Sequence, residues 1–342
     1  MQNEEFFIKK CIELAKRGIR NVSPNPMVGS VIVYNGEIIG EGYHENYGSH
    51  HAEVNAIASV IDKSLLPKST IYVNLEPCAH FGKTPPCSNL IIENKIPKVV
   101  IGSVDCFSEV SGKGIEKMKK AGIKVVVGIS EKESRELNKR FFTFHDKKRP
   151  YIILKWAESK DGYIAPKNQI EPFWMTSSES KKLVHKWRAE ETAILVGRVT
   201  AEKDNPCLTV REVEGENPIR IVIDKNLKLS TDLNLFNNNS KTIVFNAIKS
   251  GKNDTNNFIK IDFNILINNI LSELYKLNIQ SIIIEGGNKT LQSFIDENMW
   301  DEARIFTVNK TLVEGVKAPT IEGRIISEED IGGDQLKLMS NV

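Results

Sequence analysis

A histidine, a glutamate and two cysteines have the types and the order of a catalytic zinc site. His51 and Glu53 are two residues apart, and Cys78 and Cys87 follow in the run EPCAHFGKTPPC. One imidazole and two thiolates supply three protein ligands, which leaves the fourth tetrahedral position open for water. Zinc lowers the pKa of bound water to about 7. We therefore predict that His51, Cys78 and Cys87 bind Zn²⁺.

Glu53 has the position of a general acid and base rather than of a ligand. The signature H-x-E followed by P-C-x-x-C is typical of zinc nucleobase deaminases, whose glutamate moves protons. Here H-A-E and P-C are present, but the second cysteine is displaced to give P-C-x8-C. His80, two residues after Cys78, is an alternative ligand. The alternative to a zinc site is that His51 caps a helix and that the two cysteines are simply buried side chains.

Two arginines and a glycine pair in the second half have the chemistry of anion sites. Arg188 and Arg211 each offer a planar fork of donors that matches phosphate oxygens. Gly286 and Gly287 join an apolar strand pattern to a helical one, where backbone N–H groups favour an anion. No G-x-G-x-x-G follows the first predicted strand of either half, so a Rossmann dinucleotide site is not supported. An exposed helix face is the alternative for Arg188, and a tight turn for the glycines.

The elements that position these residues alternate between helical and strand patterns. Apolar spacing predicts a first helix from Phe6 to about Gly18, and Asn35-Gly36 predicts a hairpin of strands 28–34 and 37–42. Further strands are expected over 70–75, 98–102, 124–127, 151–156, 193–197, 218–224, 241–246 and 281–284. Helices are expected from about 51 to 61 and over 90–94, 113–121, 177–190, 263–277 and 290–297. The alternation predicts sheets with helices packed on their faces.

Charged residues ending in a proline, 145–150, predict a linker between domains 1–146 and 147–342. The length of 342 residues fits two domains. A net charge of +2 argues against a nucleic-acid or membrane surface. Five cysteines do not suggest a disulfide framework, so reduced thiols in a cytoplasmic protein are expected. No signal-peptide pattern or apolar run of transmembrane length is present.

Longer runs around these motifs resemble one enzyme family. HAEVNAI, NLEPCAHFGKTPPCSNLII, SPNPMVGSVIV, KWAESKDGYIA, WMTSSES and IIIEGGNKTL resemble the bifunctional deaminase/reductase of riboflavin biosynthesis. The resemblance implies an α/β fold: an N-terminal cytidine-deaminase-like three-layer α/β/α domain and a C-terminal dihydrofolate-reductase-like α/β domain. It implies zinc-dependent deamination of 2,5-diamino-6-ribosylamino-4(3H)-pyrimidinone 5′-phosphate, and then NADPH-dependent reduction of the ribosyl side chain to ribityl.

The same resemblance assigns residue roles. It makes Glu53 the catalytic acid and base, and Asn25, His44, Lys83 and Thr84 contacts of the deaminase substrate. Its implied contacts of the reductase substrate are Arg188, Leu208, Arg211 and Glu285. Its implied cofactor contacts are Glu158, Trp174, Thr200, Asp204, Gly286, Gly287, Asn288, Lys289 and Thr290. For Trp174, filling a core is the alternative to stacking on the cofactor.

Three departures from the family pattern carry expectations. Glu158 and Lys160 replace a small and an apolar residue, and a carboxylate near the cofactor could lower reductase efficiency. The chain ends soon after Leu336–Met339, so the last strand is expected to be short or absent. Alternative functions are a deaminase with a degenerate reductase half, and a zinc-stabilised nucleotide-binding or scaffolding protein. The expected partner is a small-molecule substrate, a pyrimidine ribosyl phosphate. The chain is expected to form a homo-oligomer and to bind neither nucleic acid nor a membrane.

Overall fold

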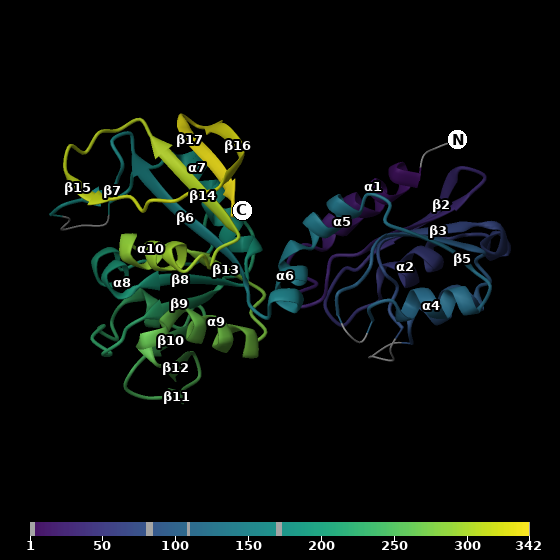
Figure 1. Ribbon diagram of the computed structural model, residues 1–342, viewed down its shortest axis with the longest axis horizontal. Helices are drawn as coiled ribbons and strands as arrows, with labels where there is room; N and C mark the ends of the chain where they lie inside the picture. Colours follow the sequence, from purple (N-terminus) through teal and green to yellow (C-terminus); the bar gives the residue numbers. More distant parts are fainter. Residues whose placement is uncertain (1–3, 80–84, 108–109, 169–172, 342) are drawn as a thin grey trace. The chain divides into compact units, whose positions relative to one another are not determined.

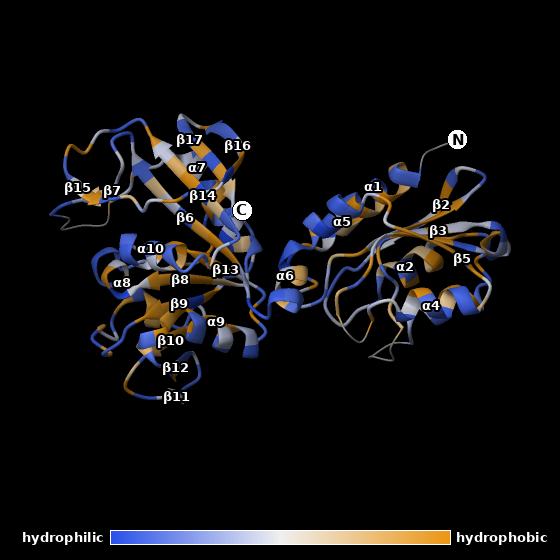
Figure 2. Cartoon of the chain, viewed as in Figure 1, coloured by the Kyte–Doolittle hydropathy of each residue, from blue (hydrophilic) through white to orange (hydrophobic). Residues whose placement is uncertain are grey.

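The computed structural model describes residues 4–79, 85–107, 110–168 and 173–341 (Figure 1). The chain divides into two compact units, Met1–Lys147 and Lys148–Val342. Each unit has its own sheet and its own buried apolar clusters. Figure 2 shows hydrophobic segments concentrated in the strands, whereas outer elements such as α5 (Glu131–Leu137) are hydrophilic. Among the described residues, no helix is both long and apolar enough to cross a membrane.

The first unit is a five-stranded sheet in the order β2-β1-β3-β4-β5. Strands β3, β4 and β5 are parallel, and β1 is antiparallel to both β2 and β3. The strands are β1 Gly29–Tyr34, β2 Glu37–Tyr43, β3 Thr70–Leu75, β4 Lys98–Ser103 and β5 Lys124–Val127. Asn35 and Gly36 both have positive φ, as a two-residue hairpin turn requires, so the predicted hairpin is confirmed.

Helices cover both faces of this sheet, which confirms the three-layer α/β/α arrangement. Alternate strand residues point to opposite faces. Val31 packs with α1 (Glu4–Ala15) on one face. Ile32 packs on the other face with α2 (Ala52–Ser59), α3 (Cys87–Glu93) and α4 (Lys113–Lys120). The predicted linker differs from the structure at its start, because α6 (Lys139–Lys147) continues through His145, whose ring contacts Phe141.

The second unit contains a ten-stranded sheet in the order β11-β12-β10-β9-β8-β13-β6-β14-β17-β16. The strands from β12 to β14 run parallel, and β11, β17 and β16 are antiparallel to their neighbours. The strands are β6 Tyr151–Ser159, β8 Ala193–Gly197, β9 Ile219–Ile223, β10 Thr242–Asn246, β11 Gly251–Lys252, β12 Asn256–Lys260, β13 Ser281–Ile284, β14 Glu302–Val308, β16 Arg324–Ile331 and β17 Asp334–Ser340. A separate pair joins β7 (Tyr163–Pro166) to β15 (Gly315–Lys317).

Four helices cover the two faces of this sheet. The face that buries Ile152 and Leu154 packs against α9 (Leu266–Lys276) and α10 (Asn288–Asp296). The face that buries Ile153 packs against α7 (Ser178–Glu190) and α8 (Arg198–Asp204). The carboxyl ends of the parallel strands therefore meet at one edge, where open α/β sheets bind their ligands.

Two expectations about strands in the second unit are wrong. The last strand is neither short nor absent: β17 has seven residues and pairs with both β14 and β16. Residues 231–260 contain more than the single predicted strand 241–246, because β12 pairs in parallel with β10. Both segments are polar along much of their length, so hydrophobic periodicity did not mark them.

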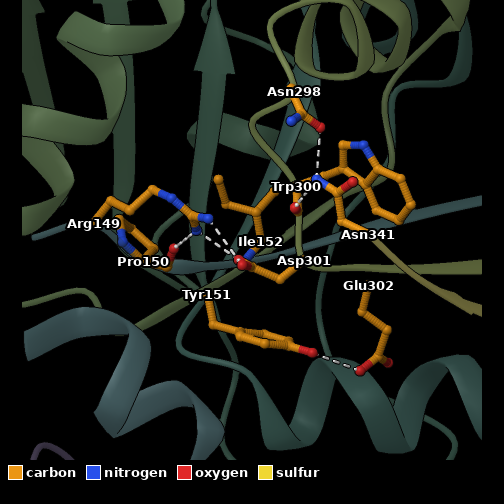
Figure 3. Close-up of polar contacts among 9 residues, drawn as sticks. All are labelled: Arg149, Pro150, Tyr151, Ile152, Asn298, Trp300, Asp301, Glu302 and Asn341. Atoms are coloured by element: carbon orange, nitrogen blue, oxygen red, sulfur yellow. Dashed lines mark hydrogen bonds and ion pairs between the residues drawn. The ribbon is translucent and has the colours of Figure 1, made fainter. Parts of the chain in front are cut away.

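The second unit begins at a buried ion pair (Figure 3). Arg149 Nη1 and Nη2 lie 2.5 and 2.8 Å from the two carboxylate oxygens of Asp301. The Ile152 N–H also donates to Asp301, at 2.9 Å. The Asn341 side chain donates to the Trp300 carbonyl at 2.9 Å. These contacts tie the start of β6, the start of β14 and the last residues of the chain together.

Candidate active sites

The three predicted zinc ligands come together from three elements of the first unit. His51 immediately precedes α2, Cys78 lies in the loop after β3, and Cys87 begins α3. His51 Nδ1 lies 3.6 Å from Cys78 Sγ and 3.4 Å from Cys87 Sγ. All three donor atoms lie within 4.8 Å of one another, and one nitrogen with two sulfurs is a donor set that zinc favours. The contact with Cys87 holds the pKa of the Cys78 thiol below its ordinary value, which favours the ligating thiolate.

Glu53 lies in the first turn of α2, beside these donors. Its side chain is 3% exposed. Burial, assisted by the nearby Cys78, raises the pKa of the Glu53 carboxyl to about 7. A carboxyl with such a pKa can both accept and donate a proton near neutral pH, as general acid–base catalysis requires.

Asn25 and His44 join the same site from the loop before β1 and the end of β2. Asn25 Nδ2 lies 3.2 Å from His44 Nε2. The His44 ring packs edge-on against the His51 ring, with the centroids 5.2 Å apart. Burial lowers the pKa of His44, which favours the neutral ring. Lys83, Thr84 and His80 lie outside the described residues.

Glu76 is a buried residue of this site that the sequence analysis did not single out. Its carboxylate accepts hydrogen bonds from the N–H groups of Gly112, Gly114 and Ile115 at 2.9, 3.0 and 3.2 Å. It therefore fixes the start of α4 against the loop that carries Cys78. Only the tertiary structure brings these groups together, so the sequence held no local signal for the contact.

In the second unit, Arg188 and Glu285 form a buried bidentate ion pair. Arg188 Nε and Nη2 donate to the two Glu285 oxygens at 3.1 and 2.7 Å, and each side chain is 8% exposed. Burial alone would raise the pKa of Glu285, but Arg188 and Lys155 outweigh it and lower that pKa to about 2. Lys155, on β6, is the charged neighbour that the sequence analysis missed, because one lysine in an apolar strand pattern has no distinctive spacing.

Arg211 and Leu208 lie in the loop that follows α8. The Arg211 N–H donates to His185 Nδ1 at 3.0 Å, and its guanidinium donates to the Thr209 hydroxyl at 3.0 Å. Leu208 is 2% exposed and has a φ of 50°, an unusual backbone conformation for a bulky residue. Burial and the positive charges of Arg188 and Arg211 lower the pKa of His185 to about 4. His185 is therefore neutral where it accepts the Arg211 N–H.

The predicted cofactor residues Thr200, Gly286, Gly287 and Thr290 lie together at the carboxyl ends of β8 and β13. A Cβ on Gly286 would lie 2.5 Å from the Gly197 nitrogen, and one on Gly287 would lie 3.0 Å from Thr200 Oγ1. A Cβ on Gly197 would lie 2.5 Å from Thr290 Oγ1. Only glycines allow these two loops to approach so closely at the ligand-binding edge of the sheet.

The other predicted cofactor residues have contacts or exposure of their own. Trp174 is 62% exposed, so it does not fill a core. Glu158 accepts a hydrogen bond from the indole of Trp156 at 2.7 Å, which holds its carboxylate against its own strand. The Asn288 side chain donates to the Lys317 carbonyl at 2.6 Å. Lys289 is exposed, and Asp204 is the last residue of α8.

Comparison with known proteins assigns a family model to each half of the chain. Residues 1–103 match the cytidine and deoxycytidylate deaminase zinc-binding region, and residues 150–328 match the RibD C-terminal domain. The riboflavin biosynthesis protein RibD of Aquifex aeolicus is 41% identical over 95% of this chain and 92% of its own length. This chain belongs to the RibD family. The Synechocystis RibD is 35% identical over 95% of this chain and 89% of its own length.

A solved RibD-family structure has the same fold throughout. The Thermotoga maritima deaminase/reductase superposes with a TM-score of 0.90, at 38% identity over 99% of each chain. RibD-family chains are bifunctional enzymes of riboflavin biosynthesis, and this chain is one: a zinc-binding deaminase and an NADPH-dependent reductase. The expected fold class, a cytidine-deaminase-like domain before a dihydrofolate-reductase-like domain, is confirmed.

Proposed function

We propose that residues 1–146 deaminate 2,5-diamino-6-ribosylamino-4(3H)-pyrimidinone 5′-phosphate and that residues 147–342 reduce the product with NADPH. The final product is then 5-amino-6-ribitylamino-uracil 5′-phosphate. The observation that carries the proposal is the convergence of His51, Cys78 and Cys87 beside the buried Glu53. The Thermotoga maritima relative is a diaminohydroxyphosphoribosylaminopyrimidine deaminase/5-amino-6-(5-phosphoribosylamino)uracil reductase, which supports both substrates.

In the deamination, His51, Cys78 and Cys87 would hold zinc, which makes water acidic enough to supply an oxygen nucleophile at neutral pH. Glu53 carries the first proton of this water to the ring nitrogen of the pyrimidine, and then carries the second proton, from the added hydroxyl, to the leaving amine. A C–O bond forms, the C–N bond breaks, and ammonia leaves. Asn25 and His44 orient the pyrimidine, since the His44 ring packs against His51 and the Asn25 side chain contacts His44.

In the reduction, the second unit would hold NADPH, which would supply a hydride to C1′ of the ribosyl group, while the ring C–O bond opens and its oxygen takes a proton from water. We assign the cofactor to the edge formed by Thr200, Gly286, Gly287 and Thr290, joined by Glu158, Trp174, Asp204, Asn288 and Lys289. Arg188 Nη1 contacts the Thr209 carbonyl only at 3.5 Å, so this nitrogen is the donor that a substrate phosphate would meet. Arg211 and Leu208 lie in the loop beside it, and Glu285 holds Arg188 in place.

We further propose that the enzyme is a cytoplasmic homo-oligomer. Five free cysteines suit a reducing compartment. Strand β16 ends the ten-stranded sheet and exposes Ile325 and Ile326, which suits pairing with a second copy. Light scattering of the purified protein measures its mass in solution. A monomer at micromolar concentration would contradict this part of the proposal.

The test of the proposed function is an assay that follows ammonia release and NADPH oxidation separately with the diaminopyrimidine phosphate. Zinc removal by a chelator should abolish ammonia release but leave NADPH oxidation intact when the deaminated compound is supplied. Ammonia release without NADPH binding would instead favour a deaminase with a degenerate reductase half. Bound zinc with neither reaction would favour a scaffold.

A further inference from the structure

We infer that Asn74 and Asn138 are positioning residues of the deaminase. Together they clamp the backbone of residues 27–29 and thereby fix Asn25 and His44 beside the zinc ligands. This inference rests on the proposed function, because it concerns how the same site holds its pyrimidine.

Asn138 satisfies both polar backbone groups of Met27. Its Oδ1 accepts from the Met27 N–H at 2.8 Å, and its Nδ2 donates to the Met27 carbonyl at 2.9 Å. The residue is 3% exposed and lies between α5 and α6, outside the matched zinc-binding region 1–103. Because hydrogen bonds are directional, two of them on one backbone residue fix its orientation as well as its position.

Asn74, on β3, adds two further hydrogen bonds to the same chain segment. Its Nδ2 donates to the same Met27 carbonyl at 3.1 Å, and its Oδ1 accepts from the Gly29 N–H at 2.7 Å. Asn74 is fully buried, at 0% exposure. A Cβ on Gly29 would lie 2.1 Å from the Cys11 carbonyl oxygen, so α1 also packs closely against this segment. The segment has no room to shift while these contacts persist.

The clamped segment adjoins both residues that we assign to the pyrimidine. Asn25 is two residues before Met27, and the His44 N–H donates to the Val28 carbonyl at 2.9 Å. The Asn25 and His44 side chains lie 3.2 Å apart. A misplacement of about 1 Å can cost a factor of about 10² in rate, so loss of the clamp should appear in catalysis.

The first experiment compares Asn138→Ala with the unchanged full chain. Deaminase kcat/KM should fall roughly 10–100-fold, while the chain keeps one zinc and its NADPH oxidation rate. Asn138→Asp keeps the volume and the acceptor for the Met27 N–H, so its loss should be smaller. Asn94→Ala is the matched control, because Asn94 also follows a helix but donates only to Leu90, at 2.8 Å. It should keep kcat/KM within about twofold.

The second experiment asks whether Asn138 acts through Asn25. In the double variant Asn25→Ala/Asn138→Ala, the loss in kcat/KM should fall well short of the product of the two single losses. Hydrogen exchange should show the Met27 amide protected in the unchanged chain and exposed in Asn138→Ala. Multiplicative losses would overturn the inference, as would zinc loss in both Asn138 variants, which would indicate a merely structural role.

Failure of the inference can be told from failure of the proposed function. An unchanged chain that releases no ammonia contradicts both. A fully active Asn138→Ala protein whose Met27 amide has lost its protection contradicts the inference alone.

Discussion

At the scale of single residues, burial sets the protonation chemistry of both units. Glu53 is a lone carboxyl in a buried position, so its pKa rises to about 7. Glu285 is equally buried, but the adjacent Arg188 and Lys155 lower its pKa to about 2. A glutamate side chain can therefore exchange a proton near neutral pH in the first unit, at Glu53, whereas Glu285 in the second unit remains charged.

Glu53→Gln should lower deaminase kcat by about 10²–10⁴-fold, because glutamine keeps the volume but cannot exchange a proton. Zinc content and NADPH oxidation should not change. Ammonia release gives the rate, and metal analysis gives the zinc content. Glu93→Gln, at an exposed site on α3, is the control. Near-normal ammonia release from Glu53→Gln would rule out the assigned role.

His185 should make the stability of the second unit depend on pH. Its pKa in the folded chain is about 4, below the ordinary value near 6.5. Between these values the unfolded chain binds a proton that the folded chain does not, so the free energy of unfolding falls as pH falls. His185→Asn keeps an acceptor for the Arg211 N–H but cannot titrate, so it should weaken this dependence.

Urea unfolding at pH 5, 7 and 8 measures the effect. All four tryptophans lie in the second unit, so their fluorescence reports on it alone. From pH 8 to 7, above both pKa values, the stabilities of the two proteins should change alike. Equal losses from pH 7 to 5 would mean that His185 does not contribute to the pH dependence.

At the scale of elements, buried side chains join segments that local patterns leave independent. Glu76 joins β3 to the start of α4, and Arg188 of α7 meets Glu285 at the end of β13. Each contact joins two elements that are distant in the sequence into one fixed edge of a site.

Glu76→Gln should destabilise the first unit by about 1–3 kcal/mol, because an amide group would face N–H donors that lose their acceptor. In calorimetry, the unfolding transition that tryptophan fluorescence does not detect belongs to the first unit. That transition should shift to lower temperature. Glu116→Gln, which changes an exposed glutamate on α4, is the matched control. An equal shift in both variants would contradict the role of Glu76 in fixing the start of α4.

At the scale of the whole molecule, we expect the two units to fold separately. A fragment of residues 148–342 should fold and oxidise NADPH with the deaminated compound. A fragment of residues 151–342 lacks Arg149 and so loses its ion pair with Asp301, whose side chain is 8% exposed (Figure 3). Breaking a buried ion pair costs about 3–5 kcal/mol, so the shorter fragment should unfold at lower urea concentration. Equal urea midpoints for the two fragments would contradict the role of the ion pair. An insoluble 148–342 fragment would contradict the domain boundary.

The sequence by itself determined the chemistry of this protein and most of its regular elements. Metal ligands and an acid–base residue must be of particular types at short spacings, so these roles could be predicted for His51, Glu53 and Cys78 without a structure. The hairpin at Asn35-Gly36 followed from backbone conformation, which is also a local property. These inferences depend on neighbours along the chain.

Only the tertiary structure showed which buried polar groups hold the sites in place. Asn138 lies 111 positions from Met27, and Glu76 lies 36 positions from Gly112. A buried side chain that accepts or donates to distant backbone groups has no periodicity and no motif of its own. Its role exists because a desolvated polar group must find a partner, and the fold decides which partner lies within reach.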